Sequence, residues 1–122
     1  MHIADPRQVP SGIFLYTLHV ARLAMLTDGP TAEEQALAAR HWAYSQHLLA
    51  RGVVVFAGRT LNRDADSFAV VAIRAPSVEA AREIVDGDAA VAGGVFTARL
   101  FPFQPMLMGD WPPEAATVTP GA

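Results

Sequence analysis

The chain has 122 residues, of which 52% are hydrophobic and 17% are charged, and its formal net charge is −3. These values predict one compact globular domain, and nine Lys and Arg residues without a basic cluster exclude the electrostatic footprint of a nucleic-acid-binding protein. The absence of cysteine excludes disulfides, thiolate nucleophiles and cysteine-based metal sites, and it is compatible with the reducing cytoplasm in which we expect the protein.

The chain is expected to begin with an irregular arm and a long strand. Residues 1–12 contain two prolines and no periodic pattern, which predicts the arm. Residues 14–26 are apolar at both alternating sets of positions, as in a strand that is covered on both faces. The wider apolar run from Gly12 to Leu26 is about 15 residues long and contains Thr17, His19 and Arg22, so it is too short and too polar to span a membrane.

A helix is predicted from Ala32 to Arg51, and local signals mark both of its ends. Thr31 is the expected N-cap, and Glu34 stands at the third helical position, so the two residues match a capping box. Gly52 follows the last helical residue, where a glycine commonly ends a helix.

Three further strands and a shorter helix are predicted in the second half of the chain. Residues 53–58 are apolar and rich in β-branched side chains, which favours a buried strand, and a polar loop follows. Residues 68–74 form the next expected strand, and Ser77 is the expected N-cap of a helix that ends at about Val85. After a stretch of small residues, the last strand is expected at residues 95–101.

The order strand–helix–strand–strand–helix–strand is typical of an α+β, ferredoxin-like domain, expected at residues 13–104 and followed by a proline-rich tail at residues 105–122. Such a domain has a four-stranded antiparallel sheet with two helices on one face. The strands are apolar on both faces, so something must cover the other one. We expect a second copy to cover it, sheet to sheet, in a homodimer. The alternative is that residues 104–122 fold back across this face.

His41 is the most informative single residue. At 100° per residue, Leu37, His41, Tyr44, Ser45 and Leu48 share one face of the predicted helix, so an imidazole points where a leucine is expected. A buried ring nitrogen without a partner costs about 1–3 kcal/mol. The ring nitrogens of His41 therefore need hydrogen-bond partners. Two interpretations provide them: a core histidine bonded to a backbone carbonyl, and a general acid or base in a cleft.

Short runs of the sequence, taken in chain order, carry a family resemblance. They are Arg40-His41-Trp42-Ala43-Tyr44, Leu48-Leu49-Ala50-Arg51-Gly52-Val53-Val54, Ala57-Gly58, Ser77-Val78-Glu79-Ala80-Ala81, Asp86-Gly87-Asp88-Ala89-Ala90-Val91-Ala92-Gly93-Gly94-Val95 and Pro102-Phe103. In this order they resemble the YciI-like family of small dimeric α/β-barrel proteins. In that pattern a histidine precedes the helix-ending glycine by eleven residues, as His41 precedes Gly52. Asp88 takes the position of the family's acidic residue.

The sequence departs from this pattern at two positions near the expected site. Ala89 stands where the family commonly has proline, and Arg59 follows Gly58 where proline is also frequent. The geometry of these loops is therefore expected to differ from that of the family.

The resemblance implies a pair of His41 and Asp88 in a cleft between the helical layer and the loops of the sheet. In such a pair the aspartate fixes the tautomer of the imidazole, and the other ring nitrogen takes or gives a proton. The implied activity is that of a cofactor-free lyase or isomerase acting on a small aromatic or lactone-like molecule. The alternative is a small-molecule binding or regulatory module that keeps the cleft without turnover.

Four further residues are candidates for substrate contacts. Tyr44 offers a phenol, and Arg59 offers a guanidinium for an anionic group, although a core tyrosine and a solvated loop arginine are the structural alternatives. Trp42, about 100° around the helix from His41, could line a pocket for an aromatic ligand. Ser45 lies one turn after His41, but a serine within a helix more often bonds its own backbone carbonyl.

Neither a metal nor a cofactor is expected. His41 and His47 are about 240° apart on the helical wheel, so they cannot bind one ion together. The glycine pair Gly93-Gly94 precedes a strand and not a helix, which does not make a phosphate cradle.

Overall fold

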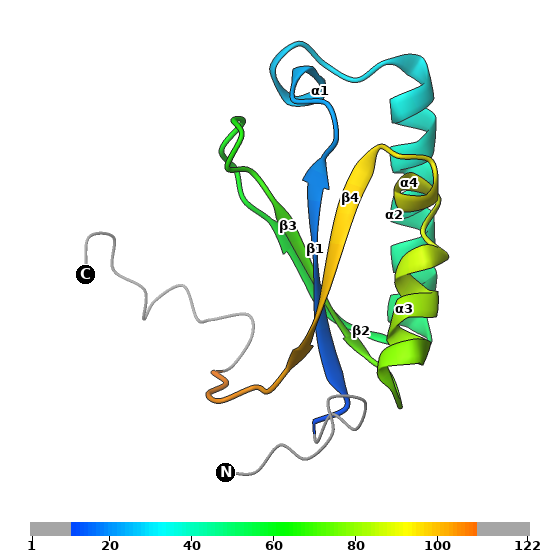
Figure 1. Ribbon diagram of the computed structural model, residues 1–122, viewed down its shortest axis with the longest axis vertical. Coiled ribbons are helices and arrows are strands. Elements are labelled where there is room, and N and C mark those ends of the chain that lie inside the picture. The colour runs from blue at the N-terminus through cyan, green and yellow to red at the C-terminus, as the bar shows by residue number, and fades with distance from the viewer. Residues whose placement is uncertain (1–10, 110–122) are drawn as a thin grey trace, which may run out of the picture.

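The computed structural model describes residues 11–109 (Figure 1). Residues 1–10 and 110–122, which make up most of the expected arm and of the proline-rich tail, lie outside these residues. Most of the segment that would cross the sheet in the alternative to a homodimer lies outside them as well. The elements follow in the order β1 (Ile13–Val20), α1 (Ala24–Thr27), α2 (Ala32–Ala50), β2 (Val54–Arg59), β3 (Ala69–Arg74), α3 (Val78–Asp86), α4 (Ala89–Ala92) and β4 (Phe96–Phe103).

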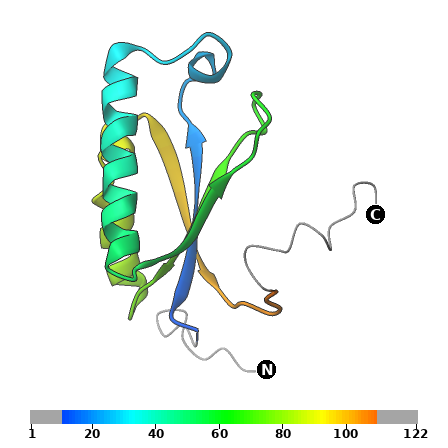
Figure 2. The ribbon, with the colours of Figure 1, turned by 180° about the vertical axis from the view of Figure 1, so that it is seen from behind.

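The strands form one four-stranded sheet in the order β2-β3-β1-β4, and all three neighbouring pairs are antiparallel. Helices α2, α3 and α4 lie together on one face of this sheet, as Figures 1 and 2 show from opposite sides. The predicted α+β, ferredoxin-like fold is therefore confirmed. No helix in the described part of the chain combines the length and the apolar character that a membrane crossing requires.

Helix α2 begins and ends where its local signals indicate. The Thr31 hydroxyl accepts a hydrogen bond from the Glu34 backbone N–H at 3.1 Å, and the Glu34 carboxylate accepts one from the Thr31 N–H at 2.8 Å. The Arg22 guanidinium also bonds this carboxylate and, with the Thr31 N–H, lowers the pKa of Glu34 to about 2. Gly52 has a φ of +76°, a left-handed conformation that glycine adopts without strain.

Two short helices, α1 and α4, were not indicated by the sequence pattern. The long first strand expected at residues 14–26 is wrong, because β1 ends at Val20 and α1 follows it. The chain turns away where Arg22 reaches across to Glu34, and the apolar residues beyond it pack over the end of the sheet instead of continuing the strand. The stretch of small residues before the last strand contains α4, which Asp88 caps.

A β-bulge in β2 decides which of its side chains face the helices. The register with β3 shifts between Val54 and Phe56, so β2 holds one extra residue there. Residues directly opposite each other in an antiparallel pair point to the same face. Val54 lies opposite the buried Ile73, and after the shift the helix-facing positions are Ala57 and Arg59, whereas Phe56 points to the open face.

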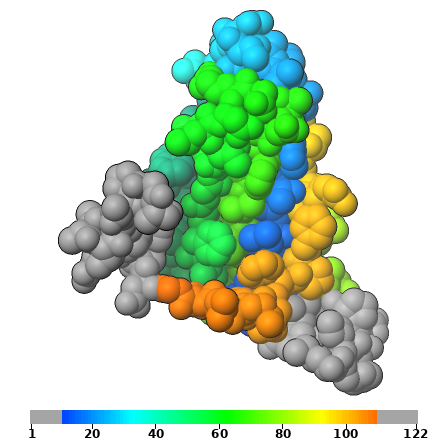
Figure 3. All heavy atoms as spheres, turned by 90° about the vertical axis from the view of Figure 1, so that its left-hand side faces the viewer, coloured from blue at the N-terminus to red at the C-terminus, as the bar shows by residue number. Residues whose placement is uncertain are grey.

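The main core fills the space between the helices and the sheet. Its buried residues are Phe14, Tyr16, Leu18, Leu48, Val54, Val71, Ile73, Ala75, Ala81 and Val85. The other face of the sheet, seen in Figure 3, has the end of β4 and the segment after it along its lower edge. Phe56, Phe101 and Phe103 are 50%, 38% and 36% exposed, so the sheet carries large apolar side chains on both faces, as expected.

Candidate functional site

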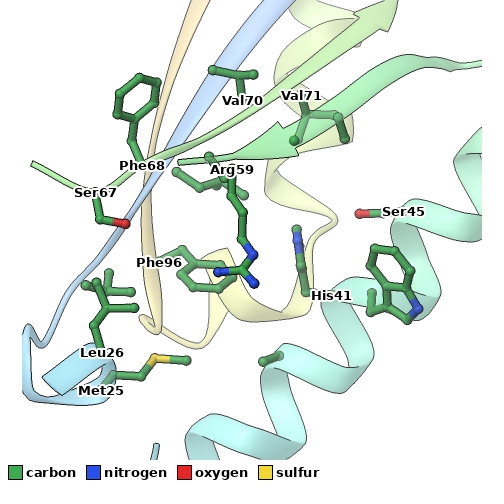
Figure 4. Close-up of a pocket in the computed structure, with 17 residues that line it drawn as sticks. Met25, Leu26, His41, Ser45, Arg59, Ser67, Phe68, Val70, Val71 and Phe96 are labelled. Atoms are coloured by element: carbon green, nitrogen blue, oxygen red, sulfur yellow. The ribbon is translucent and has the colours of Figure 1, made fainter. Parts of the chain in front are cut away.

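A cavity of about 510 Å³ lies between α2 and the helix-facing side of the sheet, with residues of α1 at one end (Figure 4). Its walls are mostly apolar, and the apolar lining includes Leu18, Met25, Leu26, Val71 and Phe96. The polar side chains in the lining belong to His41, Ser45, Arg59 and Ser67, with the indole of Trp42 beside them. None of the described residues that line it is acidic. A small, largely apolar molecule therefore fits this space.

His41 on α2 and Asp88 at the start of α4 meet at the wall of the cavity. The His41 Nδ1 atom lies 2.5 Å from Oδ2 of Asp88, a carboxylate that is fully buried. The other carboxylate oxygen, Oδ1, accepts a hydrogen bond from the Ala90 backbone N–H at 2.9 Å. The predicted contact between His41 and Asp88 is confirmed, and the alternative of a core histidine bonded to a backbone carbonyl is wrong.

This hydrogen bond determines which ring nitrogen is available for chemistry. A carboxylate accepts, so Nδ1 carries the proton and donates it, and Nε2 keeps a lone pair. The His41 side chain is 19% exposed and lines the cavity, which leaves Nε2 for a bound molecule. The edge of the ring packs on Phe96, with 5.3 Å between ring centroids and 81° between the planes. The orientation of the imidazole is thus fixed by its hydrogen bond to Asp88 and by its packing on Phe96.

Close packing of α4 against α2 brings Asp88 to His41. A Cβ atom added to Gly93, the residue after α4, would lie 2.7 Å from Cδ1 of Leu37 and 3.0 Å from the Ala89 carbonyl oxygen. Leu37 lies one helical turn before His41 on α2. The missing side chain at Gly93 is therefore what allows the two helices to approach each other at this point.

Tyr44 lies apart from the cavity, between α2 and α3. Its hydroxyl donates a hydrogen bond to the Ile84 carbonyl at 2.7 Å, and it is not among the residues of the cavity lining. Burial, with the Asp88 carboxylate nearby, raises the pKa of the Tyr44 phenol. The residue that we expected as a substrate contact thus occupies its alternative place, in the packing between two helices.

Ser45 and Trp42 do line the cavity, next to His41 on α2. The Ser45 hydroxyl oxygen is buried and has no hydrogen-bond partner within the described residues. It does not make the bond to its own helix that is common for a helical serine, which corrects that expectation. Trp42 is 64% exposed, so it stands at the rim and not in the core.

Arg59 enters the cavity lining from the end of β2, on the wall opposite α2. Its side chain extends toward the space between Phe96 and His41 in Figure 4. The sequence placed Arg59 in a polar loop, but it is the last residue of the strand, and the bulge turns it to the helix-facing side.

Several residues of the site carried no recognisable signal in the sequence. Met25 and Leu26 belong to α1, in the stretch that was taken for a strand. Phe96 is the first residue of β4, opposite Val20 of β1, and nothing in its surroundings marks it as a neighbour of His41. Tyr16 of β1 belongs to the core and does not line the cavity; its hydroxyl has no partner in the described chain, and burial raises the pKa of the phenol.

The comparisons with known proteins agree with this fold. A model of the YCII-related domain matches residues 19–104. A similar solved structure is that of 5-chloro-2-hydroxyhydroquinone dehydrochlorinase from Burkholderia phenoliruptrix AC1100 in complex with 2,5-dihydroxybenzoquinone. The TM-score is 0.57 and the sequence identity is 20%, and the match covers 75% of this chain and 93% of that chain. No curated protein sequence matches the chain. Since the family model spans most of the sequence, this chain belongs to the YCII-related domain family.

Proposed function

We propose that this chain is a cofactor-free enzyme of the lyase or isomerase type, with His41 transferring a proton on a small aromatic or lactone-like molecule. The observation that carries the proposal is the contact of His41 with the buried Asp88 at the wall of an apolar cavity. Asp88 holds the proton on Nδ1 and stabilises the imidazolium that forms when Nε2 takes a second proton. A fold shared with a dehydrochlorinase is consistent with this chemistry.

The proposed reaction starts when the lone pair of Nε2 removes a proton from the bound molecule. The electron pair of the broken bond then forms a new double bond within the molecule. In a lyase reaction, the leaving group departs with its own bonding electrons. In an isomerase reaction, no group departs, and the imidazolium returns the proton to a different atom. Next to largely apolar walls, the imidazolium and the buried Asp88 interact more strongly than they would in solvent.

The test compares His41→Gln with His47→Gln, a change at an exposed position of the same helix. A panel of chlorinated hydroquinones and small lactones is incubated with each protein, and chloride release and new isomers are followed by ion chromatography and proton NMR. We expect His41→Gln to lower turnover by about 10²–10⁴-fold, the range typical of a general acid or base. His47→Gln should behave as the wild type.

Two outcomes would contradict the proposal. Equal turnover by the two variants would show that His41 is not the proton-transferring group. A wild-type protein that binds compounds of the panel and converts none of them would favour the alternative of a binding or regulatory module.

We also propose a homodimer in which the open faces of two sheets pack together. Phe56 and Phe101 expose large apolar surfaces there, and packing against a second copy would remove them from water. Sedimentation equilibrium at micromolar concentration should give twice the mass of one chain. Phe56→Glu should shift the protein toward the monomer, because a carboxylate in this interface would lose its hydration. A wild-type chain that sediments as a monomer would contradict the proposal.

A further inference from the structure

The cavity carries a positive charge that none of its described lining residues balances. Arg59 contributes a permanent cation, and no acidic side chain lines the space with it. Asp88, the nearest carboxylate to His41, lies behind the imidazole and has both oxygens engaged. Arg59 is an exposed residue, and its guanidinium can bind a carboxylate through two N–H donors or a phenolate oxygen through one.

Two features of this chain place a cation at the cavity. In the YciI-like pattern a proline is frequent after the glycine that Gly58 represents, so the cation is one of the departures from that pattern. The bulge between Val54 and Phe56 then places Arg59 on the helix-facing side of β2. Without the extra residue, strict alternation from the buried Val54 would point Arg59 to the open face.

On the opposite wall, the buried hydroxyl of Ser45 lacks a hydrogen-bond partner within the described chain. Ser45 lies one helical turn from His41 and lines the same cavity. Rotation of the Ser45 side chain about χ1 would bring this buried hydroxyl into the cavity, where a polar atom of a bound molecule would satisfy it. Because His41 and Ser45 stand side by side on α2, that polar atom would lie next to the atom that faces Nε2 of His41.

We propose that the molecule bound here is a ring-shaped anion with polar groups on two edges. A carboxylate or phenolate on one edge binds Arg59, and a hydroxyl or carbonyl on the other edge binds Ser45. The apolar side chains of Leu18, Val71 and Phe96 line the space between these edges. This inference rests on the proposed function in one respect, which is that the molecule in this cavity is the one on which His41 acts.

The experiment measures the binding of matched probes by isothermal titration calorimetry. The probes are 3- and 4-hydroxybenzoate, their amides, which lack the negative charge, and benzoate, which lacks the hydroxyl. We expect the wild type to bind at least one hydroxybenzoate about 10- to 100-fold more tightly than its amide, as hydrogen bonds to charged groups allow. Arg59→Gln should remove this preference, whereas Arg74→Gln, an exposed arginine at the end of β3, should keep it.

Ser45 is tested with the second pair of probes. Ser45→Ala should reduce the preference for the hydroxybenzoate over benzoate by about 2- to 10-fold, the range for a neutral hydrogen bond. The preference for carboxylate over amide should remain in this variant, because Arg59 is unchanged.

The inference is overturned if the amides bind as tightly as the carboxylates, if none of the probes binds, or if Arg59→Gln and Arg74→Gln lose the charge preference alike. It is overturned for the Ser45 edge if Ser45→Ala leaves the preference for the hydroxyl intact. These results are separate from the test of the proposed function. His41→Gln should keep the Arg59-dependent preference for anions, so an anion site without His41-dependent turnover would contradict the enzyme and leave this inference standing.

Discussion

Asp88→Asn should lower the His41-dependent turnover by about 10²–10⁴-fold while leaving the protein folded. The asparagine oxygen can still accept the hydrogen bond from the Ala90 N–H that Oδ1 accepts now. The amide NH₂ group then faces His41 in place of Oδ2. Because this group is a donor, it favours the tautomer with the lone pair on Nδ1 and the proton on Nε2. In that tautomer Nε2 cannot remove a proton from the bound molecule.

Asp88→Ala should also reduce the free energy of unfolding, by about 2–4 kcal/mol. The loss combines the cap of α4, about 0.5–2 kcal/mol, with the half-buried imidazole that is left without its partner, about 1–3 kcal/mol. Urea denaturation followed by circular dichroism measures this change. Asp86→Ala is the matched control, since Asp86 is exposed and should shift stability by no more than about 0.5 kcal/mol. Equal stability of the two variants, or full turnover by Asp88→Asn, would contradict the role of Asp88.

Gly93→Ala should destabilise the protein by about 1–3 kcal/mol, the usual cost of overpacking a tight contact. The new Cβ would lie 2.7 Å from Leu37 Cδ1 and 3.0 Å from the Ala89 carbonyl oxygen, so the Leu37 side chain must change its conformation or α4 must shift relative to α2. Asp88 begins α4, and a shift of α4 should lengthen its hydrogen bond to His41 and lower turnover as well.

A double-mutant cycle separates this steric effect from a general loss of stability. Leu37→Ala removes the side chain that the new Cβ meets, so the pair of substitutions should cost less than the sum of the single ones. Gly109→Ala serves as the control, because a Cβ there meets nothing within 4 Å. Additive effects of Gly93→Ala and Leu37→Ala would show that this contact does not control the approach of the two helices.

The parts of the fold that depend on neighbouring residues could be predicted from the sequence. Thr31 with Glu34, and Gly52, mark the ends of α2 because a helix end is satisfied by groups within a few residues of it. Ser77 marks the start of α3 in the same way. The 3.6-residue period placed His41 on the inner face of α2, and the resemblance to a known family named Asp88 as its partner. All of these expectations except the pairing with Asp88 rest on a short-range pattern.

The tertiary structure decided which of the inward residues reach the cavity. Tyr44 and Ser45 are neighbours on one helical face. The Tyr44 hydroxyl donates a hydrogen bond to a carbonyl of α3, whereas Ser45 lines the cavity. A helical wheel gives the direction of each side chain and does not say what lies opposite it.

The residues that form the cavity wall opposite α2 could not be predicted from the sequence either. Arg59 faces His41 because the pairing of β2 with β3 places a bulge before it, and this register depends on strands that are joined through a long loop. Met25 reaches the cavity because β1 stops early, where Arg22 pairs with Glu34 twelve residues away. The sequence by itself determined the helix ends and the inward imidazole, since these follow from local hydrogen bonds and periodicity. Register, bulge and the meeting of distant side chains were decided by the packing of segments far apart in the chain.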